Sequence, residues 1–413
     1  MQLLKEKIQG LSFFLVIISP IKVYGFEKSR NIIDDSDGPF IVTPLVTRQV
    51  QFWEKIFFIF PSSTTIIHDV DDPDLIIQII DHEQTQKKIN ENRQVTSIKQ
   101  FAENETMNIL KNLSNGVKKL KKSYPMVTPV NDAERRIASI YLRHARSRDK
   151  FKKNPPRFRA QSGLSDTFQK AAYIGKKYLP MMEAIFSAHN LPPSLSNLVF
   201  VESMFNTEAK SKVGASGIWQ FMPQTAKKFL FITEQIDERN SPIKATKAAA
   251  QLLYKNYLIL KSWPHAITAY NHGTRGMQAA MTKLNSTNFD DVIKYHQGAT
   301  FGFASKNFYS EFIAAKRIYE QHYAQLKPSN TEDQEEVVST VIPRSTTIPE
   351  ISELIGLSID DILKFNPCII PKIQYQSPRD RLPPFFEIFG PEKNITYLSN
   401  KLNLQKVIPR DPS

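Results

Sequence analysis

One long stretch limits what this chain can fold into. From Leu164 to about Gln325, helical segments follow one another with only short interruptions. The interruptions contain proline: Leu191-Pro192-Pro193, Asn240-Ser241-Pro242 and Trp263-Pro264. Proline is accepted in the first turn of a helix but breaks a helix from within, so these positions separate successive helices. The stretch therefore predicts a mainly α body.

Smaller elements are expected on both sides of this body. Val50, Trp53, Phe57 and Phe60 recur at helical spacing, which predicts an amphipathic helix over Gln49–Phe60 that ends at Pro61. Thr64–His68 is expected to form a short strand. The length of 413 residues favours two or three units. The expected segments are a signal peptide (1–25), a mostly helical N-terminal region (26–158), the main body (159–326), a linker (327–336) and a small C-terminal unit with its tail (337–413).

The charge balance bears on the partners. Lys and Arg number 54 against 41 Asp and Glu, a formal net charge of +13. Such an excess favours nucleic acid, anionic lipid or an acidic cell-wall polymer as partners, without choosing among them. The run Lys118–Lys122 is either a solvated helix face or a patch for peripheral association with membrane or wall, and the arginines within 131–150 are expected on an exposed helix. Nothing in the sequence indicates an oligomer.

Cysteine and histidine usage excludes several kinds of site. Cys368 is the single cysteine, so neither an intramolecular disulfide nor a cysteine-based metal site can form. It is expected to be a small buried hydrophobe, with a reactive thiol as the alternative. The eight histidines contain no HExxH pair, and we expect no metal. No apolar run is long enough for a polytopic membrane protein.

The first residues have the pattern of a secretory signal. Lys5 and Lys7 precede a short apolar core, Leu11–Ile18, and Val23-Tyr24-Gly25 supplies a small-residue exit. An ordinary N-terminal strand or helix is the alternative. No cysteine lies near the apolar core, which argues against a lipid anchor. We therefore expect an exported, basic protein of the periplasm or cell envelope, and export weakens the nucleic-acid interpretation.

A carboxylate lies on an apolar helix face. Leu195, Leu198, Val199 and Glu202 are spaced at i, i+3, i+4 and i+7, so they share one face. Burial there would raise the pKa of Glu202 toward the range of a general acid. The alternative is a glutamate at the edge of the face that pairs with Lys or Arg.

The residues that follow resemble the lining of a sugar-binding site. Small, aromatic and amide residues are concentrated between Ser211 and Pro223, where Gln220 is suited to a sugar hydroxyl or N-acetyl group and Trp219 or Met222 to a pyranose face. Ala269–Gly273 then places a phenol and an amide at a helix end. Six of the 14 glycines lie between 214 and 302, which suggests a site formed by loops.

These motifs resemble those of a known family. The segment "LPPSLSNLVFVESMFNTEAKSKVGASGIWQFMPQTAKKFL" closely resembles the soluble lytic transglycosylase domain, and "DERNSPIKATKAAAQLL" and "WPHAITAYNHG" match its later motifs in order and spacing. The similarity covers roughly residues 160–325. The segments "YLPMMEAIF" and "ASKNFYSEFIAA", together with "FWEKIFFIF", resemble the membrane-bound lytic murein transglycosylase D type.

The resemblance implies a goose-lysozyme-like helical fold, peptidoglycan as substrate and no cofactor. It implies that Glu202 is the single catalytic acid/base. The residues that fall on its substrate-contact motifs are Ser203, Ser211, Gln220, Met222, Tyr270 and Asn271. His272 replaces the usual alanine, as a polar rim residue or a sugar contact.

One carboxylate is sufficient for this reaction. A pair of acids is usual in glycosidases, whereas here the muramyl C6 hydroxyl would attack its own C1 and leave a 1,6-anhydro end. None of the nearby acids is placed to demand the role of a base: Glu208, Glu234, Asp237 and Glu238. The alternatives are a hydrolytic muramidase of the same fold, a non-catalytic wall-binding protein and, third, a basic nucleic-acid binder.

The C-terminal unit resembles a degenerate LysM module, a βααβ fold that binds N-acetylglucosamine-containing glycans. Apolar residues predict two short helices split at Gly356, followed by a strand. The usual Gly-Asp-Thr near the start is replaced by Arg344-Ser345-Thr346-Thr347. Glycan binding and a packing module without a ligand both stay open.

Overall fold

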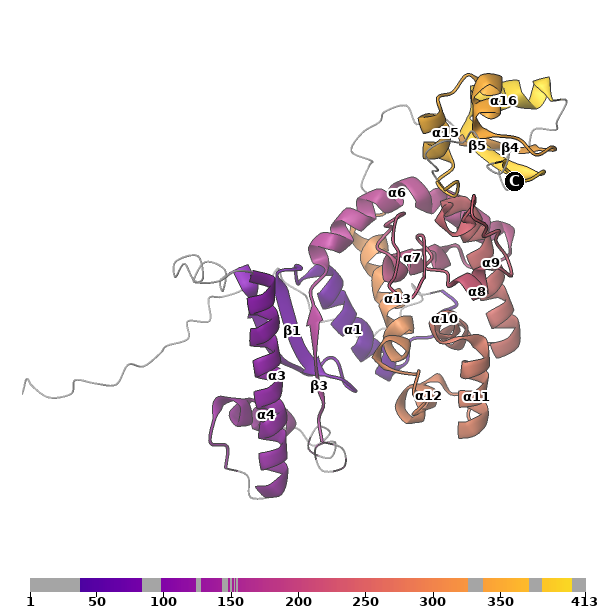
Figure 1. Ribbon diagram of the computed structural model, residues 1–413. Helices are drawn as coiled ribbons and strands as arrows, with labels where there is room; N and C mark the ends of the chain where they lie inside the picture. The colour runs from indigo at the N-terminus through magenta and orange to yellow at the C-terminus, as the bar shows by residue number, and fades with distance from the viewer. Residues whose placement is uncertain are drawn as a thin grey trace, which may run out of the picture. The chain divides into compact units, whose positions relative to one another are not determined.

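The computed structural model of the chain describes residues 38–83, 98–123, 128–142, 148, 151, 153, 155–325, 337–370 and 381–402. The predicted signal peptide, Arg143 and Arg146 lie outside these residues. The described part is mainly α, as predicted, with two small antiparallel sheets (Figure 1). Its helices are all too short or too polar to span a bilayer.

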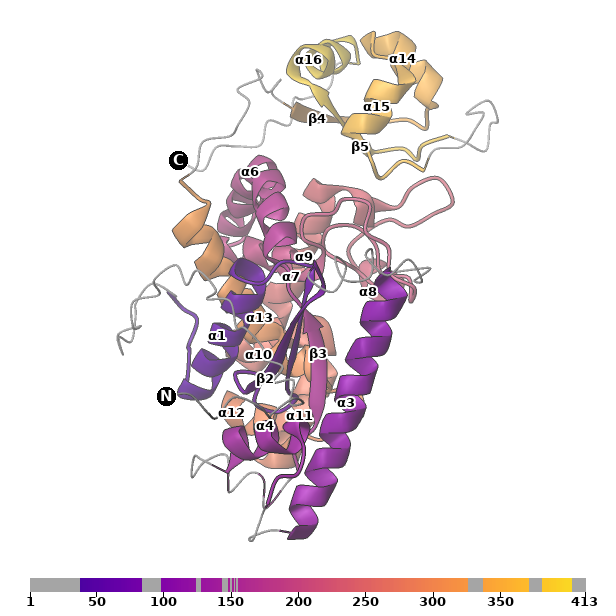
Figure 2. The same ribbon diagram turned by 90° about the vertical axis from the view of Figure 1, so that its left-hand side faces the viewer.

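The main body consists of helices around one hydrophobic core. Its elements are α6 (Ser165–Ala188), η2 (Pro193–Asn197), α7 (Leu198–Glu202), α8 (Pro223–Ala226), η3 (Glu238–Asn240), α9 (Pro242–Leu260), α10 (Trp263–His272), α11 (Thr274–Leu284), α12 (Phe289–Tyr295) and α13 (Phe303–His322). The predicted breaks are confirmed, because η2, α9 and α10 each carry proline in their first turn. Short α7 lies amid α6, α9, α10 and α13 (Figures 1 and 2).

Helix α1 (Pro44–Phe58) confirms the helix expected over Gln49–Phe60, with an earlier start because Thr43 caps it and Pro44 begins its first turn. Its buried face joins the core of the main body. Trp53 Nε1 donates to Asn307 Oδ1 of α13 over 3.2 Å. A segment from the predicted region 26–158 therefore completes the core of the predicted body 159–326, and the domain boundary itself stays a prediction.

The rest of the N-terminal region is less helical than expected. Strand β1 (Thr64–Asp69) confirms the predicted strand, and it pairs antiparallel with β2 (Ile76–Asp81) and β3 (Phe158–Ser162) in the order β2-β1-β3. Helices α3 (Ile98–Ser123) and α4 (Asp132–Tyr141) share a second core with this sheet. The sequence did not predict the sheet, in which β3 is brought to β1 from a distant part of the chain.

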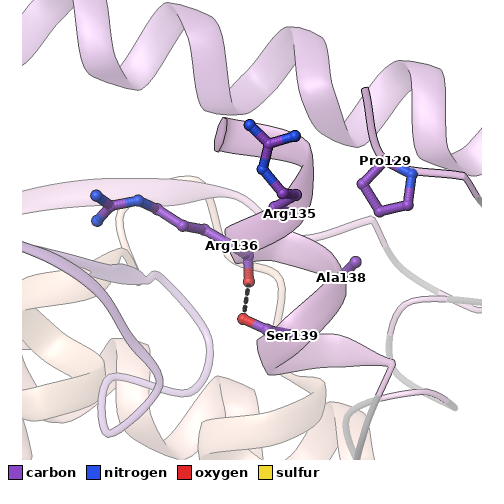
Figure 3. A pocket seen from close by; sticks show the side chains of 5 residues that line it. All are labelled: Pro129, Arg135, Arg136, Ala138 and Ser139. Atoms are coloured by element: carbon purple, nitrogen blue, oxygen red, sulfur yellow. Dashed lines mark hydrogen bonds between the residues drawn. The ribbon is translucent and has the colours of Figure 1, made fainter. Parts of the chain in front are cut away.

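The basic clusters of this region lie at the surface. The described members are exposed on or next to α3 and α4: Lys118, Lys119, Lys121, Lys122, Arg135, Arg136 and Arg148. An open hollow on α4 is lined by Pro129, Arg135, Arg136, Ala138 and Ser139 (Figure 3). None of the predicted site residues lines it, so it is separate from the chemistry discussed below.

The C-terminal unit has the expected order of strand, two helices and strand. Its elements are β4 (Val337–Ile342), α14 (Ile348–Ile355), α15 (Ile359–Phe365), β5 (Phe386–Pro391) and a further helix, α16 (Glu392–Lys401). Gly356, at φ +68°, ends α14 at the predicted split. Cys368 is fully buried in this core, and burial raises the pKa of its thiol to about 12, which confirms the expected buried hydrophobe.

Backbone hydrogen bonds join this unit to a loop of the main body. The Asp237 N–H donates to the Cys368 carbonyl over 2.7 Å, and the Ile370 N–H donates to the Gln235 carbonyl over 2.9 Å. Ile236, between them, is buried in the core of the C-terminal unit.

Candidate active site

Glu202 is the last residue of α7, the short helix enclosed by the larger ones. Leu195, Leu198 and Val199 of its predicted face are fully buried, whereas Glu202 itself is half-buried. Burial raises the pKa of Glu202 to about 8, and the negative charge of Glu311 contributes to the same shift. The carboxyl group therefore carries its proton at neutral pH, as a general acid must.

The backbone that follows Glu202 is strained. Met204 and Phe205 adopt positive φ values of 50° and 57°, a region that few non-glycine residues occupy. Phe205 is held there by packing: its ring lies 4.8 Å from the Phe200 ring, and Gly175 of α6 leaves room for it. Such strain is maintained by surrounding structure and is concentrated at functional sites.

The loop 209–223 lies next to this turn and is folded tightly on itself. Lys210 bridges to Ser216, and Ser216 to Phe221. Gly217 has φ +76°, and a Cβ atom there would lie 1.9 Å from the Arg239 carbonyl oxygen, so only glycine fits. Buried Arg239 fixes the loop through Nη1, which donates to the carbonyls of Gly214 (2.6 Å) and Phe221 (3.0 Å).

This arrangement also accounts for the nearby acids. Asp237 accepts two hydrogen bonds from the Arg239 guanidinium, at 2.9 and 2.7 Å, and Glu238 pairs with Lys244 at 2.7 Å. Glu208 and Glu234 are exposed. The prediction that these four acids are not placed as a base agrees with their positions.

The polar residues expected from the family motifs differ in the hydrogen bonds that their side chains make. Ser203 Oγ donates to the Ile218 carbonyl (2.9 Å), and Ser211 Oγ accepts from the Ala215 N–H (2.9 Å). Gln220 Nε2 donates to the carbonyls of Ala209 (3.1 Å) and Gly217 (2.8 Å). Within the described part of the chain its carbonyl Oε1 has no hydrogen-bond partner, so an acceptor is left for a ligand.

The two apolar candidates for sugar contacts, Met222 and Trp219, lie in different surroundings. Met222 is 42% exposed at the end of the loop, where its thioether is accessible to a ligand. Trp219 is fully buried, and its Nε1 donates to Thr246 Oγ1 over 2.9 Å. The suggestion that Trp219 packs on a sugar ring is therefore wrong, because the indole belongs to the core.

Tyr270 lies beside Glu202. Its half-buried hydroxyl donates to the Trp219 carbonyl over 2.8 Å, and its ring lies 5.9 Å from the Phe221 ring. Burial and the charge of Glu202 both raise the pKa of this phenol. Tyr270 thus contacts the loop 209–223 and lies near Glu202.

Asn271 and His272 lie at the end of the same helix. Exposed Asn271 accepts a hydrogen bond at Oδ1 from Ser305 Oγ of α13 (2.7 Å). His272 is half-buried, with its ring centroid 4.8 Å from that of Phe301 and 6.3 Å from that of His296. Gly273, at φ +90°, ends the helix as the motif predicts.

Glu311 was not predicted as part of this site. It is half-buried on α13, far along the chain from Glu202, and burial raises the pKa of its carboxyl group to about 8. Its segment, "ASKNFYSEFIAA", was recognised only as a family motif. A polar residue within an otherwise apolar helix face was the available signal, since Phe308, Ala314 and Ala315 lie three or four positions from Glu311 and are buried.

We expect Tyr270→Phe to weaken activity and leave the fold intact. The variant loses the hydrogen bond to the Trp219 carbonyl, worth about 1 kcal/mol, and the same loss in the transition state lowers kcat/KM about fivefold. Turnover of glycan strands and thermal unfolding, measured side by side, test this. A variant with normal kcat/KM and a greatly reduced Tm would instead make Tyr270 purely structural.

Comparisons with known proteins match the segment that carries these residues. The family described as the transglycosylase SLT domain matches residues 181–293, which include Glu202, the loop and Tyr270. Membrane-bound lytic murein transglycosylase D of Escherichia coli (strain K12) is 25% identical over 185 residues, 43% of this chain and 39% of that protein. A putative tributyltin chloride resistance protein of Alteromonas sp. (strain M-1) is 33% identical over 122 residues, 29% of this chain and 58% of that protein.

Two solved structures show weaker similarity. The lytic transglycosylase Slt of Pseudomonas aeruginosa matches with a TM-score of 0.31 and 18% identity, over 54% of this chain and 38% of that one. The 70 kDa soluble lytic transglycosylase of Escherichia coli matches with a TM-score of 0.31 and 16% identity, over 46% of this chain and 32% of that one. The chain spans about two fifths of the length of transglycosylase D. Within these bounds, residues 181–293 of the chain match the transglycosylase SLT domain, and part of the chain is similar in sequence to membrane-bound lytic murein transglycosylase D.

Proposed function

We propose that the chain is a peptidoglycan lytic transglycosylase that cleaves the β-1,4 bond between N-acetylmuramic acid and N-acetylglucosamine. The observation that carries this proposal is the carboxyl group of Glu202, placed at the end of α7 within the segment that matches the SLT domain and shielded enough from water for its pKa to be raised. Its pKa of about 8 makes it an acid at neutral pH, and the adjacent loop supplies polar and apolar contacts for sugars.

The reaction needs one acid that also acts as a base. Protonated Glu202 donates its proton to the glycosidic oxygen, and the bond from C1 to that oxygen breaks. The C6 hydroxyl of the same muramyl residue then bonds to C1, and its proton returns to Glu202. Because this nucleophile is tethered to the reacting sugar, its effective concentration exceeds that of any external acceptor.

The surrounding residues are proposed as substrate contacts. Gln220 offers its carbonyl Oε1 to a sugar hydroxyl or amide, and exposed Met222 offers an apolar surface. Ser203, Ser211, Tyr270 and Asn271 keep the loop and helix ends in place around Glu202, and their remaining hydrogen-bonding capacity is directed to the glycan. We further propose export to the periplasm or cell envelope and a LysM-like role for residues 337–413.

The product provides the experiment. We expect digestion of purified sacculi to release muropeptides that end in 1,6-anhydro-N-acetylmuramic acid, each lighter by one water than the hydrolysis product. Borohydride should leave these ends unchanged because they have no free reducing carbon. Mass analysis before and after reduction measures both properties. A Glu208→Gln variant, altered at an exposed glutamate near the site, serves as the control with wild-type products.

One observation favours a second candidate function. Glu311 lies near enough to Glu202 to raise its pKa, and a hydrolytic muramidase needs a second carboxyl group near the general acid. Fully reducible ends in the same digest would show that water is the acceptor and would replace the transglycosylase by the muramidase.

A further inference from the structure

The segment between α8 and η3 contains a short hairpin, residues 231–238. The Thr233 N–H donates to the Ile236 carbonyl over 2.7 Å and holds the hairpin together. Backbone groups of successive residues in an extended strand alternate between its two edges. The carbonyl of Gln235 and the N–H of Asp237 therefore face the outer edge of the hairpin, where another segment can pair with them.

Residues 368–370 of the C-terminal unit pair with this outer edge. The Asp237 N–H donates to the Cys368 carbonyl over 2.7 Å, and the Ile370 N–H donates to the Gln235 carbonyl over 2.9 Å. The hairpin of the main body and the segment after α15 thus form a short antiparallel ladder.

An apolar side chain anchors the ladder. Ile236 lies opposite Ile369 in the antiparallel bridge and is only 1% exposed. It is buried in the same core as Cys368, Ile369 and the other apolar residues of the C-terminal unit. The core of this unit therefore contains a side chain of the main body, which distinguishes the unit from a module attached through a linker alone.

Two lysines of α9 add to the docking. Lys244 Nζ lies 4.4 Å from the centroid of the Phe386 ring of β5. Lys247 Nζ lies 3.6 Å from Glu387 Oε1 of the same strand. Contacts with the hairpin and with α9 hold the C-terminal unit at two places.

A chain of hydrogen bonds leads from this docking to the loop 209–223. Asp237, whose N–H is bound by the C-terminal unit, accepts at its carboxylate from Arg239 Nε (2.9 Å) and Nη2 (2.7 Å). Arg239 Nη1 in turn donates to the carbonyls of Gly214 (2.6 Å) and Phe221 (3.0 Å). The side chains of Asp237 and Arg239 are only 12% and 10% exposed, so water has little access to replace these bonds.

The loop has further contacts that do not pass through the C-terminal unit. Ser216 Oγ donates to Asn240 Oδ1 over 2.7 Å. Gly217 packs against the Arg239 carbonyl oxygen without room for a Cβ atom. Loss of the docking should therefore loosen the loop without unfolding it.

We propose that the C-terminal unit positions the loop 209–223: its pairing with the hairpin 231–238 fixes Asp237, and the pair of Asp237 and Arg239 transmits this constraint to the loop backbone. The inference rests on the proposed function, in which Gln220 and Met222 of the loop contact the glycan. Glu202 lies on α7, outside this path, so the docking should affect substrate binding more than proton transfer.

Ile236→Asp and Lys247→Glu test the proposal on full-length protein. The first places a carboxylate in the apolar core, and the second places like charges at the contact with Glu387. In both variants KM for glycan strands should rise, by about tenfold in Ile236→Asp, while kcat stays within about threefold of the wild type. Ile236→Leu retains an apolar side chain and should restore KM. Lys255→Glu, altered at an exposed lysine of the same helix, is the control for Lys247→Glu and should match the wild type.

Two further measurements follow the docking and the loop directly. Cys368 is the single cysteine and is fully buried beside the pairing, so its labelling by a thiol reagent reports how often the pairing opens. We expect labelling to be about tenfold faster in Ile236→Asp. Amide hydrogen exchange should also be faster in the loop 209–223 and unchanged in α13, which shows that the main core stays folded. If Ile236→Asp loosens α13 as well, Lys247→Glu supplies the result.

The outcomes separate this inference from the proposed function. Faster labelling of Cys368 together with faster exchange of the loop supports the inference. Faster labelling with wild-type loop exchange overturns it, and so does unchanged labelling in both variants, because the docking would then not depend on the observed contacts. If the wild type releases no muropeptides, the proposed function fails, and loop exchange still measures whether the C-terminal unit positions the loop.

Discussion

Glu202→Gln is expected to abolish cleavage of peptidoglycan while the protein stays folded. Glutamine fills the volume of a protonated glutamate but has no acidic proton for the leaving oxygen. The loss should be about 10²–10⁴-fold, the usual contribution of a general acid. Release of muropeptides from sacculi by equal amounts of the variant and the wild type measures it. Clearing at the wild-type rate by the folded variant would contradict the assignment.

The same variant has a stability signature that controls for misfolding. Burial raises the pKa of Glu202 to about 8, above that of the unfolded chain, so the folded state binds the extra proton between about pH 4.5 and 8. The contribution of this group to the free energy of unfolding therefore falls as pH rises through that window. Glutamine has no such dependence. We expect the Tm of Glu202→Gln to equal or exceed that of the wild type at pH 8.

Arg239→Met is expected to destabilise the protein more than any surface change. Arg239 and Asp237 are paired at 2.7 Å with side chains only 10% and 12% exposed. Removing the arginine leaves a buried carboxylate without its partner and takes a donor from the carbonyls of Gly214 and Phe221. Breaking a buried pair in this way costs about 3–5 kcal/mol. Urea denaturation of the variant and the wild type measures the difference.

Arg135→Met is the matched control for that experiment. Arg135 pairs with Asp132 at 2.5 Å, but both side chains are largely exposed, at 58% and 86%. Exposed pairs contribute less than about 1 kcal/mol, so this variant should unfold close to the wild type. Equal destabilisation by the two substitutions would show that the Arg239 pair does not hold the loop.

The Arg239 substitution should also affect activity, because Arg239 holds the loop 209–223 that carries proposed substrate contacts. Arg239 holds two of its carbonyls, and the loop carries Gln220 and Met222. Gln220 has φ +47°, a strained conformation for a side chain of this kind. If Arg239 fixes the loop, the substitution should reduce activity together with stability, and a second change of Asp237→Asn should recover part of the stability.

Features that depend on residues close together in the chain could be predicted from the sequence. The starts of η2, α9 and α10 followed from proline, because proline fixes φ and is tolerated in a first turn. The split at Gly356 followed from the need for a positive φ at a helix end. The apolar face of Glu202 followed from helical spacing, which also predicted the rise in its pKa.

Only the tertiary structure decided which distant segments meet. Trp219 looked like a ligand-binding aromatic residue, but packing of α9 against its loop buries it and satisfies its N–H with Thr246. Helix α1 precedes the strands of the sheet in the sequence, yet it packs against α13 and belongs to the core of the main body. Periodicity identifies a buried face without naming the face that covers it.

Glu311 shows most clearly the difference between what the sequence determined and what only the tertiary structure decided. The sequence by itself determined that Glu202 lies on an apolar face, because that depends on residues within one or two helical turns. It did not determine that Glu311 of α13 lies near this acid, because the approach of the two depends on how the helices pack. The energy of a charge depends on every group around it in space, so the protonation of this site is a property of the folded protein.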